Sequence, residues 1–322
     1  MIVLYTIITH RLLKAKLLYS FGGSSTMSIS VSFCKTLNKF FPTPVHPFNL
    51  ANEGKQSYAE WQFERGEESI RFFQTFASKE EMFKDKIVLD IGCGAGGKTL
   101  HYATLGAKYV FGIDPVEKYK EEATALAHKK GLQDLTSFIT GDAAKMPFES
   151  NVIDTIIMND AMEHVDDPIA VINECYRVLK KGGRLYVNFP PYHHPYGAHL
   201  SDVIGIPWVH KLFDEPTLVQ VYKDLVQQYP DAEDRIQFRI GNLQGGEEYF
   251  SYINKMTLER FDRILSIIPF QVLHYQYVPL RPYFKTLSML PVFQEYFVKM
   301  VVCVLEKAST KTCTSFEKEI QK

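Results

Sequence analysis

The chain has 322 residues, and its 36 Lys and Arg against 37 Asp and Glu leave a formal net charge of −1. This balance argues against a nucleic acid as the main ligand, because binding a polyanion needs a surplus of cationic side chains. With 46% hydrophobic and 23% charged residues, the composition is that of an ordinary globular protein.

The cysteines and the apolar runs indicate the compartment. The five cysteines are widely spaced, and none belongs to a CxxC pair. This pattern argues against a disulfide framework or a structural zinc site and favours a reducing compartment, so we expect the cytoplasm. No apolar run reaches the ~18 residues needed to span a membrane. We expect a monomer or a homodimer.

Residues 1–50 are predicted to be an N-terminal extension that is partly disordered. They show no sustained hydrophobic period, and Pro42, Pro44 and Pro47 interrupt any helix. From residue 58 to residue 76 the spacing of apolar side chains predicts one amphipathic helix.

Between residues 87 and 189, short apolar runs alternate with helical patterns. Strands are predicted at 87–91, 109–113, 136–140, 152–158 and 184–188, and helices at 98–105, 116–130 and 168–180. Such alternation builds βαβ units, and hence a parallel sheet with helices on both faces. The predicted fold class is therefore α/β, with residues 51–189 as the core and its preceding helix.

After residue 189 the alternation stops. Residues 190–256 are rich in Pro, His and aromatic side chains, with a predicted helix at 215–228, and we expect them to be an inserted substrate lid. Regular structure resumes over 257–308, where Thr257 can cap a helix and strands are predicted at 271–279 and 297–305. These two strands suggest an antiparallel pair that closes the sheet, and 309–322 is a polar tail.

The first strand runs into a glycine-rich turn, and a helix follows. Glycines permit a tight turn that brings the backbone against a ligand, and the helix N-terminus offers free N–H groups. The spacing of Gly92, Gly94 and Gly97 also fits a dinucleotide fingerprint, as does Asp114 at the end of the second strand. The glycines alone therefore leave an NAD(P)-dependent oxidoreductase open as an alternative.

Three further features favour another nucleotide cofactor. Asp90 precedes Gly92 by two residues, where its carboxylate can face a cationic ligand. Asp142 follows the third strand, where a carboxylate can accept a hydrogen bond from an adenine amino group. The C-terminal strand pair is the third feature. A Tyr-x-x-x-Lys pair, which would support the oxidoreductase, does not follow the fourth strand.

Five motifs in order over about 100 residues resemble the class I S-adenosylmethionine-dependent methyltransferases, most closely the small-molecule group called methyltransferase type 11. They are Val88-Leu-Asp-Ile-Gly-Cys-Gly-Ala-Gly-Gly97, Val110-Phe-Gly-Ile-Asp-Pro115, Gly141-Asp-Ala-Ala-Lys-Met-Pro-Phe148, Ile153-Asp-Thr-Ile-Ile-Met-Asn-Asp-Ala-Met-Glu-His-Val165 and Arg177-Val-Leu-Lys-Lys-Gly-Gly-Arg-Leu185. The resemblance implies a Rossmann-like seven-stranded sheet whose last strand is inserted antiparallel, with the lid between strands 5 and 6.

The resemblance also implies a cofactor, S-adenosylmethionine, and a small-molecule acceptor. It places Asp90, Gly92 and Gly94 at the methionine end, Asp114 on the ribose, and Asp142 and Ala143 beside the adenine. Asn159 is expected next to the cofactor, and the neighbouring Cys93, Pro115 and Asp160 complete the expected cofactor-binding set.

The candidate catalytic residues come from two segments. On a helical turn Asp160, Glu163 and His164 would share one face, which could orient a base or hold a divalent metal. His164 as a base or a wall of the site is the favoured reading, and no metal is assigned.

The second segment follows the fifth strand and faces the methyl donor, because ligands in open α/β sheets bind at the carboxyl ends of strands. It contributes the candidates Tyr192, His194 and His199. Tyr58 and Trp61 are candidates for an aromatic wall that holds a sulfonium. The wealth of aromatic residues suggests an apolar or aromatic acceptor. A SAM-binding protein without catalysis remains an alternative, against which the intact glycine loop argues.

Overall fold

A computed structural model describes residues 25–54, 56–291 and 293–308, so the predicted tail over 309–322 and the first 24 residues of the predicted extension lie outside the described part. The chain divides into two compact units. We call residues 56–194 and 254–308 the sheet unit, and residues 25–54 and 195–253 the helical unit. Among the described residues, no helix combines the length and apolar character that crossing a membrane requires.

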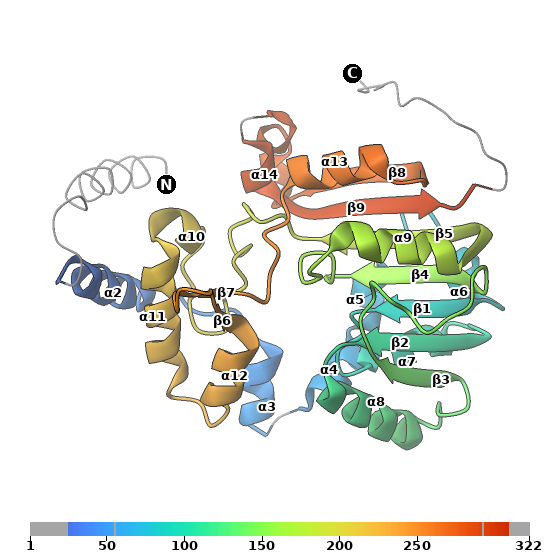
Figure 1. Ribbon diagram of the computed structural model, residues 1–322, viewed down its shortest axis with the longest axis horizontal. Helices are drawn as coiled ribbons and strands as arrows, with labels where there is room; N and C mark the ends of the chain where they lie inside the picture. Colours follow the sequence, from blue (N-terminus) through green and yellow to red (C-terminus); the bar gives the residue numbers. More distant parts are fainter. Residues whose placement is uncertain (1–24, 55, 292, 309–322) are drawn as a thin grey trace. The chain divides into compact units, whose positions relative to one another are not determined.

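A seven-stranded sheet forms the centre of the sheet unit (Figure 1). Its strands are β1 (Ile87–Ile91), β2 (Tyr109–Asp114), β3 (Thr136–Thr140), β4 (Ile153–Asn159), β5 (Leu179–Phe189), β8 (Gln271–Pro279) and β9 (Val298–Glu306). The order is β3-β2-β1-β4-β5-β9-β8, and β9 is antiparallel to both of its neighbours. The predicted α/β fold, with its last strand inserted antiparallel, is confirmed.

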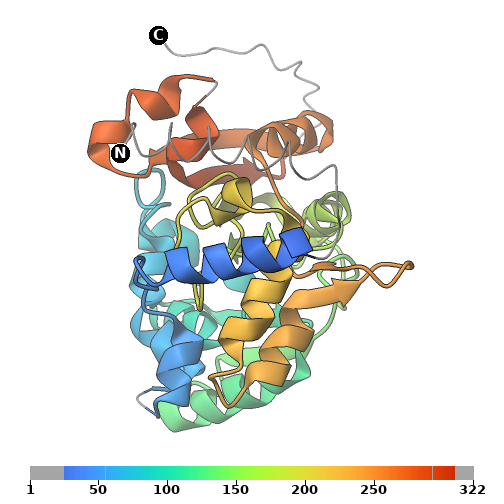
Figure 2. The same cartoon turned by 90° about the vertical axis from the view of Figure 1, so that its left-hand side faces the viewer.

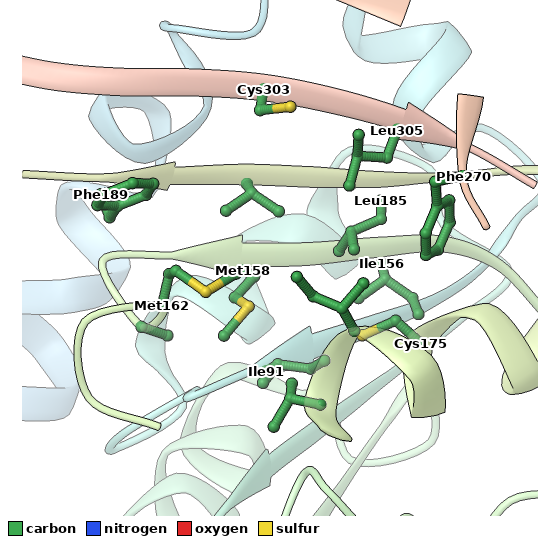
Figure 3. Close-up of a cluster of buried hydrophobic side chains, with 14 of the residues drawn as sticks. Ile91, Ile156, Met158, Met162, Cys175, Leu185, Phe189, Phe270, Cys303 and Leu305 are labelled. Carbon is green, nitrogen blue, oxygen red and sulfur yellow. The ribbon is translucent and has the colours of Figure 1, made fainter. Parts of the chain in front are cut away.

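Alternate residues of the central strands enter two different apolar layers. Leu185 and Val187 of β5 belong to one buried cluster, whereas Tyr186 between them belongs to another. Figure 3 shows the first cluster, to which Leu185, Cys303 and Leu305 of the sheet and Cys175 of a covering helix all belong. This period of two follows from the pleat of a strand, and it means that the sheet is covered on both faces.

The helices of the sheet unit follow the predicted order. They are α4 (Tyr58–Glu64), α5 (Gly66–Ile70), α6 (Lys79–Phe83), α7 (Gly97–Thr104), α8 (Glu117–Lys130), α9 (Pro168–Val178), α13 (Leu258–Ile267) and α14 (Gln294–Phe297). Thr257 caps α13, since its side chain accepts a hydrogen bond from the Arg260 N–H at 3.1 Å, as predicted.

Among the boundaries that differ from the predictions, two have a clear physical reason. The single helix predicted over 58–76 is wrong, because the chain leaves helical geometry at Arg65 and forms α4, α5 and turns. The break precedes Gly66, where a Cβ would lie 2.2 Å from Cγ of His101, so close packing against α7 requires glycine there. The helix predicted to reach residue 180 ends at Val178, because Leu179 already pairs with Ile153 of β4.

The helical unit contains several elements that the sequence analysis did not predict, and the helix over Ser25–Asn38 is the longest of them. The elements of this unit are α2 (Ser25–Asn38), α3 (Pro47–Asn52), α10 (Val209–Leu212), α11 (Glu215–Val226), α12 (Ala232–Arg239), β6 (Ile240–Asn242) and β7 (Glu248–Phe250). Helix α2, blue in Figure 2, packs Val31 and Cys34 into the same core as α11. Apolar side chains also lie on its exposed side, so the sequence shows no single stripe.

Candidate active site

The glycine loop after β1 requires glycine at several positions, and Gly92 and Gly94 are two of them. Gly92 and Gly94 have φ values of +70° and +53°, in the left-handed region. A Cβ at Gly92 would lie 2.6 Å from Cβ of Ala161, and one at Gly94 would lie 3.0 Å from Nε2 of Gln62. The loop therefore presents bare backbone at the carboxyl end of β1, where ligands of such sheets bind.

Asp90 is a buried acid directly below this loop. Its Oδ2 accepts a hydrogen bond of 2.6 Å from the Thr99 hydroxyl on α7. Burial raises the pKa of Asp90 to about 7, against the Thr99 hydrogen bond and the positive charge of Lys98, which favour the carboxylate. A cation beside Asp90 would shift it further toward the carboxylate.

Asp114 at the end of β2 holds the glycine loop. Its Oδ2 accepts a hydrogen bond from the Gly94 N–H at 2.9 Å, and its Oδ1 accepts one from the Val116 N–H at 3.0 Å, across Pro115. Burial raises the pKa of Asp114, and these two backbone donors oppose that rise. A carboxylate has about four lone-pair sites, so two stay available for a ligand.

The end of β3 provides a more open part of the site. Asp142 is exposed, and its Oδ1 accepts a hydrogen bond from the Ala144 N–H at 2.8 Å, which fixes the turn through Ala143. The hydroxyl of Thr140, just before this turn, is buried and has no hydrogen-bond partner among the described residues. A buried hydroxyl without a partner is rare, and it indicates room for a polar ligand atom or water.

Two asparagines lie side by side at the ends of β4 and β5. Asn159 and Asn188 are register partners, and both are buried. Within the described part of the chain, Oδ1 of Asn159 and Nδ2 of Asn188 have no partner. The sequence analysis did not assign Asn188, although a polar residue that ends an apolar strand, as Asn159 does, is the signal that would have found it.

Asp160 links this pair to the glycine loop's helix. Its Oδ2 accepts a hydrogen bond of 2.8 Å from Nδ2 of Asn159 and lies 3.6 Å from Nζ of Lys98 on α7. Lys98, which the sequence analysis also left unassigned, thus brings a positive charge close to the Asp160 carboxylate.

Cys93 is a buried side chain within the glycine loop. Burial raises the pKa of its thiol well above the ordinary value, with further contributions from the negative charges of Asp90 and Asp114. A thiol is a poor nucleophile compared with its thiolate, so Cys93 acts here as a packing residue.

Helix α4 covers the glycine loop. The Gly97 N–H at the start of α7 donates to Oε1 of the buried Gln62 at 3.3 Å. The ring of Tyr58 lies against Gly94 and has its centroid 5.8 Å from that of Tyr119. Tyr58 is thus the proposed wall residue that touches the loop, whereas Trp61 lies beneath the Arg65 guanidinium. The polar Gln62 was not predicted.

The expectation that Asp160, Glu163 and His164 share a helical face is wrong. Asp160 has φ +51°, and a turn rather than a helix follows it. The physical reason is that the Asp160 N–H still pairs with the Asn188 carbonyl at 3.0 Å, as an extension of the sheet. Glu163 is buried, which raises its pKa, and its Oε1 lies 4.0 Å from Nε2 of the exposed His164.

Asn254 clamps the turn that carries His164. Its Nδ2 donates to the carbonyls of Met162 and Val165 at 2.8 and 2.7 Å, and its N–H donates to the Glu163 carbonyl at 2.7 Å. The sequence separation of about 90 residues explains why sequence reasoning missed it.

The loop after β5 brings two predicted residues into the sheet unit. The Tyr192 N–H donates to the Met256 carbonyl at 2.7 Å. Burial lowers the pKa of His194 to about 4, and the positive charge of Lys299 lowers it further. His194 is therefore neutral at neutral pH and can accept a proton.

His199 belongs to the helical unit and has φ +53°. Its carbonyl accepts hydrogen bonds from Arg239 and from the Tyr252 hydroxyl. Arg239 in turn lies 3.4 Å from the buried Asp202. His199 is thus held by a buried charged network of its own unit.

Part of the chain is similar in sequence to known methyltransferases. Residues 89–187 match the family described as "Methyltransferase domain". The chain is 32% identical over 153 residues to a sterol 24-C-methyltransferase of Pneumocystis carinii, covering 43% of this chain and 40% of that protein. It is 33% identical over 121 residues to a probable chloroplastic tocopherol O-methyltransferase of rice, covering 38% and 33%. The chain thus spans about two fifths or less of these relatives.

Solved structures share the fold at low identity. A putative sarcosine dimethylglycine methyltransferase from Galdieria sulphuraria aligns with a TM-score of 0.50 at 15% identity, over 81% of this chain and 97% of that one. The Haloferax volcanii complex between the Trm112 methyltransferase activator and the putative methyltransferase aligns at 0.50 and 14% identity, over 83% and 98%. At these identities the likeness concerns the fold.

Proposed function

Residues 89–187 belong to the class I S-adenosylmethionine-dependent methyltransferases, and from this premise we propose that the protein methylates an O, N or C atom of a small-molecule acceptor. The observation that carries the proposal is the glycine loop, whose bare backbone lies between the carboxyls of Asp90 and Asp114 at the carboxyl edge of the sheet.

The residues present fit S-adenosylmethionine, the cofactor of this family. Asp90 offers a negative charge for its amino group, with Gly92, Cys93 and Gly94 as the adjacent backbone. Asp114 and Pro115 would lie at the ribose, and Asp142 and Ala143 at the adenine. The buried polar atoms of Thr140 and Asn159 that lack a hydrogen-bond partner among the described residues support this assignment. Asp160, which follows Asn159, completes the set.

When bound, S-adenosylmethionine supplies a methyl group that is already electrophilic because it is attached to a sulfonium. The chain must then align the acceptor atom with that methyl group and exclude water, and alignment can lower the barrier by about 7–11 kcal/mol. An O–H or N–H acceptor also loses a proton. His194, whose lowered pKa keeps its ring neutral, is one candidate to take it, and His164, His199 and Tyr192 are the further candidates.

An apolar or aromatic acceptor is the class we favour. Relatives that match this chain are named for sterol, tocopherol and norajmaline methylation. The wealth of aromatic side chains after β5 supports the same class, because planar and apolar molecules bind in sites lined by such rings.

We place the protein in the cytoplasm, as a monomer or a homodimer. The four cysteines in the described part of the chain are free thiols, which agrees with a reducing compartment.

Calorimetric titration with S-adenosylmethionine, S-adenosylhomocysteine and NAD⁺ tests the proposal. We expect the first two to bind and NAD⁺ not to bind. Asp114→Ala should weaken S-adenosylmethionine binding by about 1–3 kcal/mol, because it removes a hydrogen-bonding carboxylate. Asp134→Ala, at an exposed acid on the same unit, serves as the control.

Binding of NAD⁺ alone would overturn the proposal in favour of an oxidoreductase. If S-adenosylmethionine binds but a broad acceptor screen with labelled methyl donor stays blank, the non-catalytic alternative gains support.

A further inference from the structure

The connection between β8 and β9 exposes large apolar side chains. It contains two 3₁₀ turns, η1 (Pro282–Phe284) and η2 (Leu287–Met289), and then α14. Its base is closed by a hydrogen bond of 2.7 Å from the Leu280 N–H to the Phe297 carbonyl. We call residues 281–291 and 293 the apolar loop. Its exposed apolar side chains are Tyr283 (76%), Met289 (66%), Phe293 (48%) and Leu290 (46%).

The apolar loop is held in place by internal contacts, although these side chains are exposed. Phe284 packs between Tyr283 and Phe297, with ring centroids 4.6 and 4.7 Å away. The Ser288 hydroxyl donates to the Lys285 carbonyl at 2.8 Å. The loop thus has inward-facing anchors as well as outward-facing apolar side chains. Four large exposed apolar residues within so short a segment indicate an interaction surface rather than scattered surface residues.

The charge of the apolar loop is entirely positive. Arg281 and Lys285 are exposed, and no Asp or Glu occurs between Asp262 and Glu295. The carboxylate of Glu295 accepts hydrogen bonds from the backbone N–H groups of His193 and Leu258, at 3.1 and 3.3 Å. It is therefore turned toward the protein and does not offset the exposed cations.

Two more cations lie beside the loop. Arg71 and Lys299 both lie over the ring of Phe72, at 5.0 and 5.9 Å from its centroid. Burial lowers the pKa of Lys299, and the charges of Arg71 and Arg281 lower it further, which indicates that these cations are neighbours. The more weakly acting negative charges of Asp160 and Glu68 oppose this lowering. Within the described residues, Arg71, Arg281, Lys285 and Lys299 have no acidic group at ion-pairing distance. Such a surface complements negative charge.

The apolar loop lies at the ligand-binding edge of the sheet. Strands β5 and β8 are both antiparallel to β9, so their carboxyl ends lie at the same edge. The loop follows the carboxyl end of β8, at the same end of the sheet as Asn159 and Asn188 (Figure 1). A surface bound there would be close to where an acceptor enters.

We propose that the apolar loop docks the protein on an anionic lipid surface. Met289, Leu290 and Phe293 enter the boundary between head groups and acyl chains, Tyr283 lies at the level of the head groups, and Arg281 and Lys285 contact lipid anions. Docking by this loop does not depend on the proposed function. Only its consequence does, namely that a lipophilic acceptor reaches the site from the bilayer without crossing water.

Co-sedimentation of the full-length protein with two kinds of vesicle tests the docking. One is phosphatidylcholine alone, and the other is an equimolar mixture of phosphatidylcholine and phosphatidylserine. We expect binding to the anionic vesicles that weakens as salt is raised. The triple variant Tyr283→Ser/Met289→Ser/Phe293→Ser should bind at least about tenfold more weakly, because it removes the inserted apolar area.

The double variant Arg281→Gln/Lys285→Gln should also bind more weakly, by about tenfold or more, because each cation near an anionic surface adds to binding. The matched control is Ile169→Ser on α9, since Ile169 is 39% exposed but lies beside Asp166 and Asp167. This control should bind as the wild type does. Unchanged circular dichroism would establish that each variant is folded.

Several outcomes would overturn the docking proposal. They are no wild-type binding to either vesicle, equal binding to both, or full binding by the triple variant. A wild-type dimer that the triple variant abolishes, without vesicle binding, would identify the apolar loop as a contact between two copies instead. The vesicle assay contains neither methyl donor nor acceptor. Its outcome therefore does not bear on the proposed methyl transfer, which the titration described above tests.

Discussion

Asp90 is a buried acid whose charged form is unfavourable in the ligand-free protein but would stabilise a bound cation. It is 2% exposed, and within the described part of the chain its carboxyl group accepts one side-chain hydrogen bond, from the Thr99 hydroxyl. Burial disfavours its charged form and raises its pKa to about 7. The folded chain therefore retains a proton on Asp90 at pH values where the unfolded chain has lost it. A cationic ligand group would reverse that preference.

This difference predicts how stability depends on pH. The contribution of protonated Asp90 is fully present below the unfolded pKa and is lost as pH rises through about 7. Between about pH 5 and pH 8 the ligand-free wild type should lose on the order of 2 kcal/mol more stability than Asp90→Asn, which stays neutral throughout. Urea unfolding at both pH values measures this. Parallel pH profiles for the two proteins would exclude a raised pKa for Asp90.

At the scale of elements, short turns rather than helices present the site residues. The turn over 161–165 follows β4, and it has no regular hydrogen-bond ladder of its own. Asn254, which lies just before α13, supplies the missing donors through its side chain and backbone. The position of His164 thus depends on a residue from a distant part of the chain.

Removing this clamp should loosen the turn without unfolding the sheet. Asn254→Ala leaves the carbonyls of Met162 and Val165 without their side-chain donor, at a cost of about 1–3 kcal/mol. Hydrogen exchange of the peptide that covers the turn should then accelerate by about tenfold or more. Asn242→Ala, at an exposed position of β6, is the control and should leave this peptide unchanged. An unchanged exchange rate in Asn254→Ala would show that the hydrogen bonds of Asn254 do not stabilise the turn.

At the scale of the molecule, each unit has its own core and its own buried polar network. In the helical unit, Asp202 is fully buried, accepts a hydrogen bond of 2.9 Å from the Tyr222 hydroxyl and lies 3.3 Å from Arg235 and 3.4 Å from Arg239. Both arginines are buried as well. A buried cation that loses its anion is strongly destabilising, so Asp202 is a sensitive point of this unit alone.

The two tryptophans allow this independence to be measured, since Trp61 lies in the sheet unit and Trp208 in the helical unit. Asp202→Ala should destabilise the helical unit by about 3–5 kcal/mol. In urea, the transition reported by Trp208 in a Trp61→Phe background should shift to lower denaturant. The transition reported by Trp61 in a Trp208→Phe background should stay in place, as should S-adenosylmethionine affinity. Equal shifts of both transitions would show a single cooperative unit instead.

Local sequence patterns were enough to predict most strands and helices of the core and the glycine loop. Strands β1, β3 and β8 have the predicted bounds, because runs of apolar, β-branched residues between turn signals are local features. Gly92 and Gly94 could be identified for the same reason, since a tight turn after a strand requires them whatever surrounds it. The place of β9 in the sheet followed from the family resemblance rather than from the local pattern.

Contacts between residues that are distant in the chain became visible only in the folded structure. The partnership of Asn159 with Asn188, the clamp from Asn254 and the packing of Gln62 on Gly97 all join residues that are far apart in the chain. The same holds for α2, whose Val31 and Cys34 are buried only because α11 lies beside them. Local patterns encode backbone preference and periodicity, whereas these contacts depend on how strands and helices pack, which no short window of sequence contains.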